Sequence, residues 1–315
     1  GQRYIPYTGA GGEHPAGGTP QSVASITKDD VEKFYQKGFL ADFSVAIFTG
    51  DISAAAAVAS TEKYLSGMRM YVRDPGAASM RAEPDGLPSF GGDMPQSARR
   101  LVVVDLPKSG QASVGYFKTN RGVGRRDPLY YTASVFNSVL GGGYSSRLNF
   151  EIRIKRGLSY GAGSSFAWRW NAMNFSARAQ TKNESAGQVA ELVIAELSKL
   201  KDGNVTGDEL VPRKSVLTGN FGRNLETTAG LANALADLYT FGIPALELNS
   251  FVNNVNAIAD SQIKDFASRA IVDGDIIIVG DYSIFKDDLA KRFPGMKVDV
   301  IKADDLDLSK DNLRK

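Results

Sequence analysis

Two side chains with complementary hydrogen-bonding chemistry, Arg153 and Tyr160, lie seven residues apart on either side of Gly157. A guanidinium presents a rigid fork of N–H donors that suits a carbonyl or a carboxylate. A phenol is a neutral donor for an oxyanion that forms in a tetrahedral intermediate, and one such donor contributes about 3 kcal/mol to the transition state. Residues 140–160 contain no His or Cys. The pair therefore has the chemistry to hold a peptide carbonyl without a metal of its own.

The same two residues also have a purely structural interpretation. Arg153 can cap the C-terminus of a helix that ends near Gly157, where a left-handed glycine is typical, and Tyr160 can pack within a following hairpin. Residue types and spacing alone favour this structural interpretation over the functional one.

The segment that carries Arg153 has a mixed pattern. Its apolar residues alternate strictly, which is the period of a strand, and they are Leu148, Phe150, Ile152 and Ile154. Against that, Glu151 and Lys155 have the spacing of a helical ion pair, and Gly157 suits a helix end. The pattern alone favours a strand.

The elements that must position this segment mix hairpins with helices. Strand-like runs at 100–106 and 112–118 flank a Pro/Gly turn, and the runs at 160–168 and 173–180 predict a second hairpin. Helical periodicity follows over three further stretches, residues 127–140, 185–200 and 226–239. We therefore predict an α+β fold, with a two-layer antiparallel sheet and helices packed on one face.

A short internal repeat suggests a duplication. Residues 25–53 and 259–283 share one plan: a capped helix, an apolar strand, a Gly-Asp turn and the start of another helix. The alternative is a chance likeness of two ordinary units. A duplication of equal copies implies that the first copy lacks roughly its first 130 residues.

The repeat and a Pro/Gly-rich stretch together define the expected domains. Residues 73–95 contain four prolines and four glycines, which excludes a long helix or a central strand. We expect residues 1–72 to be the C-terminal part of a first α+β domain, 73–95 to be a linker, and 96–315 to be a complete second α+β domain.

Composition sets the remaining limits. The 315 residues carry 37 basic and 35 acidic side chains, and a net charge of +2 gives no field that would favour a nucleic-acid partner. The chain has no Cys, which excludes disulfides and thiolate zinc sites and suits the cytoplasm or the periplasm. The sequence contains no run of about 18 apolar residues, which is the length that a membrane-spanning helix needs.

The run Leu-Gly-Gly-Gly-x-Ser-Ser-Arg-Leu at 140–148, followed by Glu-x-Arg and then Arg-Gly-Leu-Ser-Tyr, resembles a known family. It is similar to the C-terminal domain of the pitrilysin/insulinase-type zinc metallopeptidases, which include the mitochondrial processing peptidases. The resemblance implies that the ambiguous segment is a helix. It also implies that Arg153 and Tyr160 bind the substrate backbone near the zinc.

Two further groups of residues are weaker candidates. A glycine-rich loop of the processing peptidases lies at the place of Gly141, Gly142 and Gly143, which makes these glycines candidates for substrate contact. Their alternative role is a flexible exit from the preceding helix. Four aromatic residues either line a peptide cavity or pack in the core, and these are Phe166, Trp168, Trp170 and Phe175.

The family binds zinc through an inverted His-x-x-Glu-His helix and a distal glutamate in its first domain. This sequence has one histidine, His14, so the motif is absent, and a catalytic zinc site needs three protein ligands. We expect no cofactor in this chain, which is predicted to be inactive alone. Zinc is expected in a missing N-terminal part or in a partner subunit.

Two functions follow from the resemblance. In the first, the chain is the substrate-binding, non-zinc half of a zinc endopeptidase. It would act on a peptide or protein substrate, in a homo- or heterodimer with a zinc-bearing subunit. In the second, it is an inactive scaffold or regulatory subunit of a heteromeric peptidase. The periplasm is favoured over the cytoplasm, since bacterial relatives of this kind are often exported.

Overall fold

The computed structural model describes residues 17–41, 44–68, 99–307, 310 and 313–315. They belong to two units. The first comprises the described residues of 88–220 and 246–315, and the second those of 16–87 and 221–245. The predicted linker, residues 73–95, lies outside the described residues, so the predicted domain boundaries stay a prediction.

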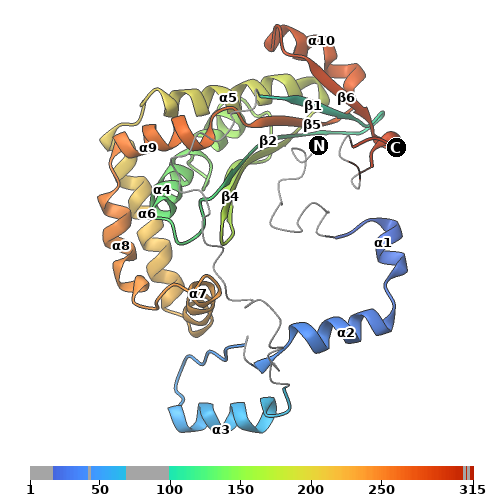
Figure 1. The fold of residues 1–315 in the computed structure, drawn as a ribbon. Helices are drawn as coiled ribbons and strands as arrows, with labels where there is room; N and C mark the ends of the chain where they lie inside the picture. The colour runs from blue at the N-terminus through green and yellow to red at the C-terminus, as the bar shows by residue number, and fades with distance from the viewer. Residues whose placement is uncertain (1–16, 42–43, 69–98, 308–309, 311–312) are drawn as a thin grey trace. The chain divides into compact units, whose positions relative to one another are not determined.

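The first unit is built on one six-stranded sheet with the strand order β3-β4-β2-β5-β1-β6 (Figure 1). The strands are β1 (Leu101–Asp105), β2 (Ala112–Arg121), β3 (Ala162–Trp168), β4 (Ala172–Thr181), β5 (Asp275–Gly280) and β6 (Val298–Lys302). The α+β class is confirmed, and the sheet is mixed, since β1 runs parallel to both β5 and β6. Strands β5 and β6 lie parallel on either side of β1, and α10 (Tyr282–Arg292) provides the crossover that connects them.

The first predicted hairpin is wrong and the second is confirmed. Although β1 and β2 follow each other in sequence, β5 lies between them and pairs with both. The run Ile276–Ile278 is apolar enough for a central strand. Strands β3 and β4 form the second predicted hairpin, with Trp168 opposite Met173.

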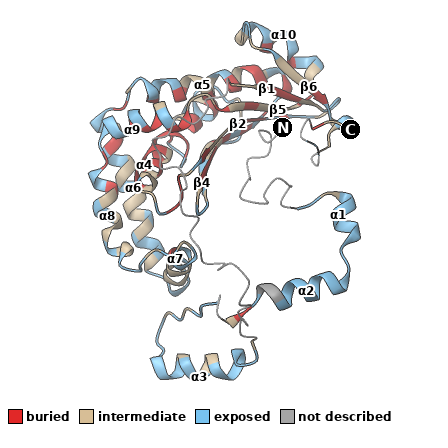
Figure 2. Ribbon diagram, in the orientation of Figure 1, coloured by how far each residue is buried: buried red, intermediate tan, exposed pale blue. Residues whose placement is uncertain are grey.

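Helices cover one face of this sheet, as predicted (Figure 1). The remaining helices that include residues of the first unit are α4 (Leu129–Leu140), η2 (Asn149–Ile154), η3 (Asn183–Ser185), α5 (Ala186–Lys201), α6 (Gly207–Leu225), α8 (Glu247–Ala257), α9 (Asp260–Phe266), η4 (Ala267–Ile271) and η5 (Ala303–Asp305). Their inner faces and the strands hold the buried residues (Figure 2). The core contains the contacting rings of Phe136, Phe175 and Phe266.

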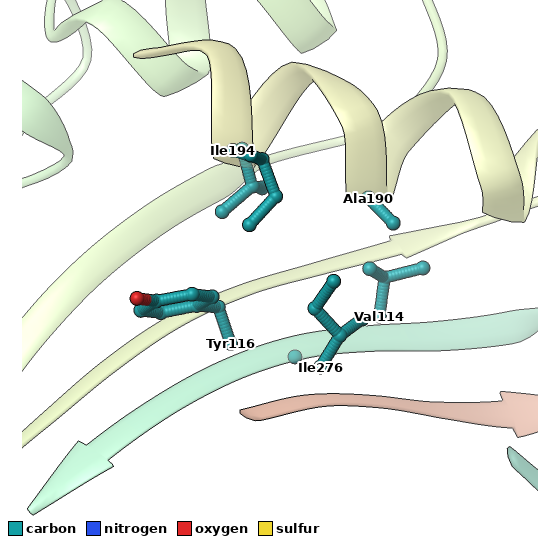
Figure 3. Close-up of a pocket in the computed structure, with 7 residues that line it drawn as sticks. Val114, Tyr116, Ala190, Ile194 and Ile276 are labelled. Atoms are coloured by element: carbon teal, nitrogen blue, oxygen red, sulfur yellow. The ribbon is translucent and has the colours of Figure 1, made fainter. Parts of the chain in front are cut away.

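The space between α5 and the sheet is filled by side chains (Figure 3). Val114 and Tyr116 of β2, Ile276 of β5, and Ala190 and Ile194 of α5 line it and leave no room for a water molecule. This part of the molecule is therefore packed core.

The second unit contains α1 (Pro20–Ser25), α2 (Lys28–Gly38), α3 (Ala54–Leu65) and α7 (Thr228–Thr240). The helices α2 and α3 match the helical parts of the predicted repeat. Residues 44–49, which were predicted as a strand, form none in the structure, whereas their counterpart β5 lies between two strands. A strand exists only with a partner, because its backbone groups must be hydrogen-bonded.

Candidate functional site

The segment that carries Arg153 is helical, as the resemblance implied. It forms the π-helix η2, in which Ile152 is buried, as is Leu148 directly before the helix, whereas Phe150 and Ile154 are half exposed. The alternating apolar residues therefore form two pairs, each with a spacing of four residues, and the two pairs lie on different faces of a helix. Strand periodicity and this helical arrangement give the same apolar pattern over so short a stretch.

Gly157 ends this helix, as predicted, with a left-handed φ of +62°. Its N–H donates to the carbonyl of Arg153 at 3.0 Å, and the N–H of Leu158 donates to the carbonyl of Ile152 at 2.9 Å. Backbone groups thus cap the helix. The Arg153 side chain is not needed for that purpose.

The guanidinium of Arg153 instead lies over the ring of Tyr144, 5.2 Å from the ring centroid. A cation over an aromatic face is attracted by the ring quadrupole. Tyr144 was not predicted as a site residue. The available signal was an aromatic residue directly after the three glycines.

Arg153 differs from the arginines on either side of it in having no carboxylate partner. Arg147 forms a bidentate ion pair with Glu209, at 2.8 and 2.5 Å, and Arg156 is paired with Glu151. Within residues 99–307 no carboxylate forms an ion pair with Arg153. Its contact with the ring of Tyr144 leaves its positive charge in place.

The carboxylate of Glu151 is charged in this setting. Burial acts to raise its pKa, but hydrogen bonds from Arg156 and Lys155 outweigh that effect and hold the pKa of Glu151 below its usual value. Glu151 thus forms ion pairs with Lys155 and Arg156.

The phenol of Tyr160 is at the surface, with 91% of the residue exposed. It precedes β3 by two residues and does not pack within the β3–β4 hairpin, which removes the structural interpretation of this side chain. Arg153 and Tyr160 are thus both exposed, and they lie on either side of Gly157 in the chain. The ring that Arg153 covers is that of Tyr144.

The three candidate glycines are not equivalent. A Cβ on Gly141 would lie 2.3 Å from the backbone nitrogen of Ser164, whose N–H donates to the Gly141 carbonyl at 3.0 Å. A Cβ on Gly142 would lie 2.9 Å from the carbonyl oxygen of Asn137, whereas Gly143 has open space around it. Close backbone packing explains the first two glycines, and Gly143 is the one with room for a ligand.

The neighbouring polar residues hold this loop in place. The Ser146 hydroxyl donates to the Gly143 carbonyl at 2.5 Å, and Arg213 donates to the Ser145 hydroxyl at 2.7 Å. The loop therefore has a defined position next to η2.

The aromatic candidates belong mainly to the core. The rings of Phe166, Trp168 and Phe175 contact each other or other core rings. Trp170 is 55% exposed at the β3–β4 turn, and Arg126 lies over its ring.

Metal ligands do not cluster in the described part of the chain, where no group of three or more His, Cys, Asp or Glu side chains could hold an ion. His14 lies outside the described residues. The described residues thus form no group that fits a zinc ion, and the resemblance places the zinc outside this chain. No described helix is long and apolar enough to cross a membrane.

A family model described as the peptidase M16 inactive domain matches residues 25–216, which is more than half of the chain. The chain therefore belongs to the peptidase M16 inactive-domain family. This is the pitrilysin-type family that the residues around Arg153 resemble.

Individual relatives agree with this assignment. An uncharacterized zinc protease of Streptomyces coelicolor is 28% identical over 221 residues, covering 70% of this chain and 46% of that protein. A protein of Helicobacter pylori described as a non-peptidase homolog is 24% identical over 249 residues, covering 79% of this chain and 54% of that protein. The chain thus spans about half the length of these curated relatives.

Among solved structures, the peptidase M16 inactive domain of Pseudomonas fluorescens superposes with a TM-score of 0.67 at 23% identity. The match covers 85% of this chain and 61% of that one. At this identity the likeness shows the fold alone.

Proposed function

We propose that this chain is the substrate-binding, non-zinc part of a zinc-dependent endopeptidase. In this proposal Arg153 binds a carbonyl or carboxylate of an extended peptide through its guanidinium donors. The O–H of Tyr160 donates to the oxyanion of the tetrahedral intermediate, which stabilises the transition state more than the ground state. Gly143 gives the peptide backbone room to approach.

The observation that carries the proposal is the state of Arg153. A surface arginine next to acidic residues normally pairs with one of them, as Arg147 and Arg156 do. Arg153 lies on an aromatic ring instead. The ring holds the cation in place without neutralising it, which is what an anionic or carbonyl ligand requires.

Zinc would be supplied from outside the described residues, by another part of the polypeptide or by a partner subunit. It would act as a Lewis acid and activate water. The residues of this chain contribute binding and orientation of the peptide, and donation of a hydrogen bond at the Tyr160 oxygen.

The test is Tyr160→Phe in the assembled peptidase, isolated with the natural partners of this chain. Removing one donor to the oxyanion is expected to lower kcat about 100-fold with a smaller change in KM. Tyr239→Phe is the matched control, since Tyr239 is also exposed and belongs to α7. An unchanged cleavage rate in Tyr160→Phe would contradict the proposal.

The second candidate is a scaffold or regulatory subunit without a catalytic role. It is favoured by the description of the Helicobacter pylori relative as a non-peptidase homolog. It predicts that Arg153→Ala and Tyr160→Phe both leave the activity of the assembly unchanged. Removal of the whole chain would still lower the activity.

A further inference from the structure

Asn149 is a buried polar residue at the first position of η2, with only 4% of the residue exposed. Its Nδ2 donates to the carbonyl of Tyr144 at 2.5 Å. Its Oδ1 accepts from the backbone N–H of Ala162, with 3.4 Å between the heavy atoms. Both ends of this one amide group are therefore engaged, by two different segments of the chain.

The two partners of Asn149 lie next to the two candidate residues. Tyr144 is the residue whose ring supports the guanidinium of Arg153. Ala162 is the first residue of β3 and follows Tyr160 by two positions. Asn149 also starts the helix in which Arg153 lies four residues further on. One side chain thus joins the glycine loop, the helix and the strand at their junction.

We propose that Asn149 is a positioning residue that holds Arg153 and Tyr160 in one arrangement for the peptide. This inference rests on the proposed function. Asn149 is too buried to touch a peptide itself and acts through the carbonyl of Tyr144 and the amide of Ala162. Loss of its amide would let the loop and the strand start move apart, and small displacements of catalytic groups reduce rates strongly.

Asn183 provides a matched control. It is also 4% exposed, its Nδ2 donates to the carbonyl of Ser109 at 2.7 Å, and its Oδ1 accepts from the N–H of Asp281 at 3.0 Å. It therefore has the same chemistry and the same burial but joins the β1–β2 connection to the end of β5. Replacing either asparagine removes two buried hydrogen bonds, while only Asn149 contacts the candidate site.

The experiment compares Asn149→Ala with Asn183→Ala in the assembled peptidase, with an internally quenched decapeptide pool as the substrate. Thermal unfolding of both variants is measured first, so that rates are compared at equal fractions folded. Asn149→Ala is expected to lower kcat about tenfold or more relative to Asn183→Ala. Asn149→Asp keeps the shape of the side chain but buries a carboxylate and sets one of its oxygens against the Tyr144 carbonyl, so a loss at least as large as that of Asn149→Ala is expected.

A double-mutant cycle with Tyr160→Phe separates this inference from the proposed function. If Asn149 acts by positioning Tyr160, Asn149→Ala costs less in the Tyr160→Phe background than in the unaltered chain. If Tyr160→Phe lowers the rate while Asn149→Ala and Asn149→Asp match Asn183→Ala, the positioning role is refuted and the proposed function stands. If Tyr160→Phe has no effect, the proposed function itself fails.

Discussion

Arg153 shows how the surroundings of one side chain change what it can bind. Its neighbours Arg147 and Arg156 have the same guanidinium group, but carboxylates already occupy their donors. The ring of Tyr144 fixes Arg153 while leaving its charge intact. Under the proposed function, a carbonyl or carboxylate of the ligand would bind a guanidinium that the ring of Tyr144 already holds in position.

At the same scale, the buried phenol of Tyr116 makes the stability of the fold depend on alkaline pH. Its O–H donates to the carbonyl of Ile271 and it accepts from the N–H of Gly274 at 2.8 Å. Burial raises the pKa of Tyr116 to about 12, against the opposing effect of the Gly274 hydrogen bond. In the unfolded chain a tyrosine ionises near pH 10.

Tyr116 therefore stabilises the fold fully below about pH 10, and this contribution is lost as the pH rises toward 12. A difference of about two pKa units corresponds to roughly 2–3 kcal/mol at most. We expect Tyr116→Phe to reduce the free energy of unfolding by about 1–2 kcal/mol at neutral pH, because two buried backbone groups lose their partner. The fall in stability between pH 10 and 12 should become shallower.

Urea unfolding followed by circular dichroism at several alkaline pH values measures this dependence. Tyr239→Phe is the control, since its side chain is half exposed. An equal fall in stability for Tyr116→Phe and the unaltered chain would show that other groups cause it.

At the scale of elements, the candidate site is a junction of a loop, a π-helix and an edge strand. The glycine loop touches β3 through the Gly141 carbonyl, and η2 is joined to both by Asn149. The β3 edge is thus partly covered by the loop at Ser164. These contacts position the helix that carries Arg153 and the start of the strand that follows Tyr160.

Gly141→Ala tests the close packing of this junction. The added methyl group would lie 2.3 Å from the backbone nitrogen of Ser164, which cannot move without disturbing β3. We expect a loss of about 1–3 kcal/mol in the free energy of unfolding. Gly143→Ala is the matched control, because nothing lies within 4 Å of its added Cβ.

Chemical denaturation of the two variants tests whether Gly141 is needed for close packing and whether Gly143 is not. Equal stabilities would mean that the loop yields to the methyl group and that Gly141 is not required for packing. A stable Gly143→Ala variant with weaker peptide binding would instead support substrate contact at Gly143.

At the scale of the whole molecule, the chain corresponds to about half of its curated relatives. Its first unit has a large hydrophobic core, whereas α1, α2 and α3 bury none of their described residues. The sequence holds one histidine and no cysteine. Such a chain should not depend on a structural metal for its stability.

Dialysis of the purified chain against a chelator is therefore expected to leave its thermal midpoint unchanged. Differential scanning calorimetry before and after the treatment measures the midpoint. A fall of several degrees that added zinc reverses would show a metal site in this chain.

The sequence by itself determined the family, the α+β class, the second hairpin and the left-handed end of the helix at Gly157. These features depend on local patterns, because turn residues, apolar periods and a glycine after a helix act over a few neighbours.

Only the tertiary structure decided the position of β5 between β1 and β2 and the contact of Arg153 with the ring of Tyr144. Residue periodicity within one segment decides neither of these, because both depend on which segments folding brings together. A strand order is a property of the whole sheet, and the partner of an arginine is decided by which groups folding brings within reach.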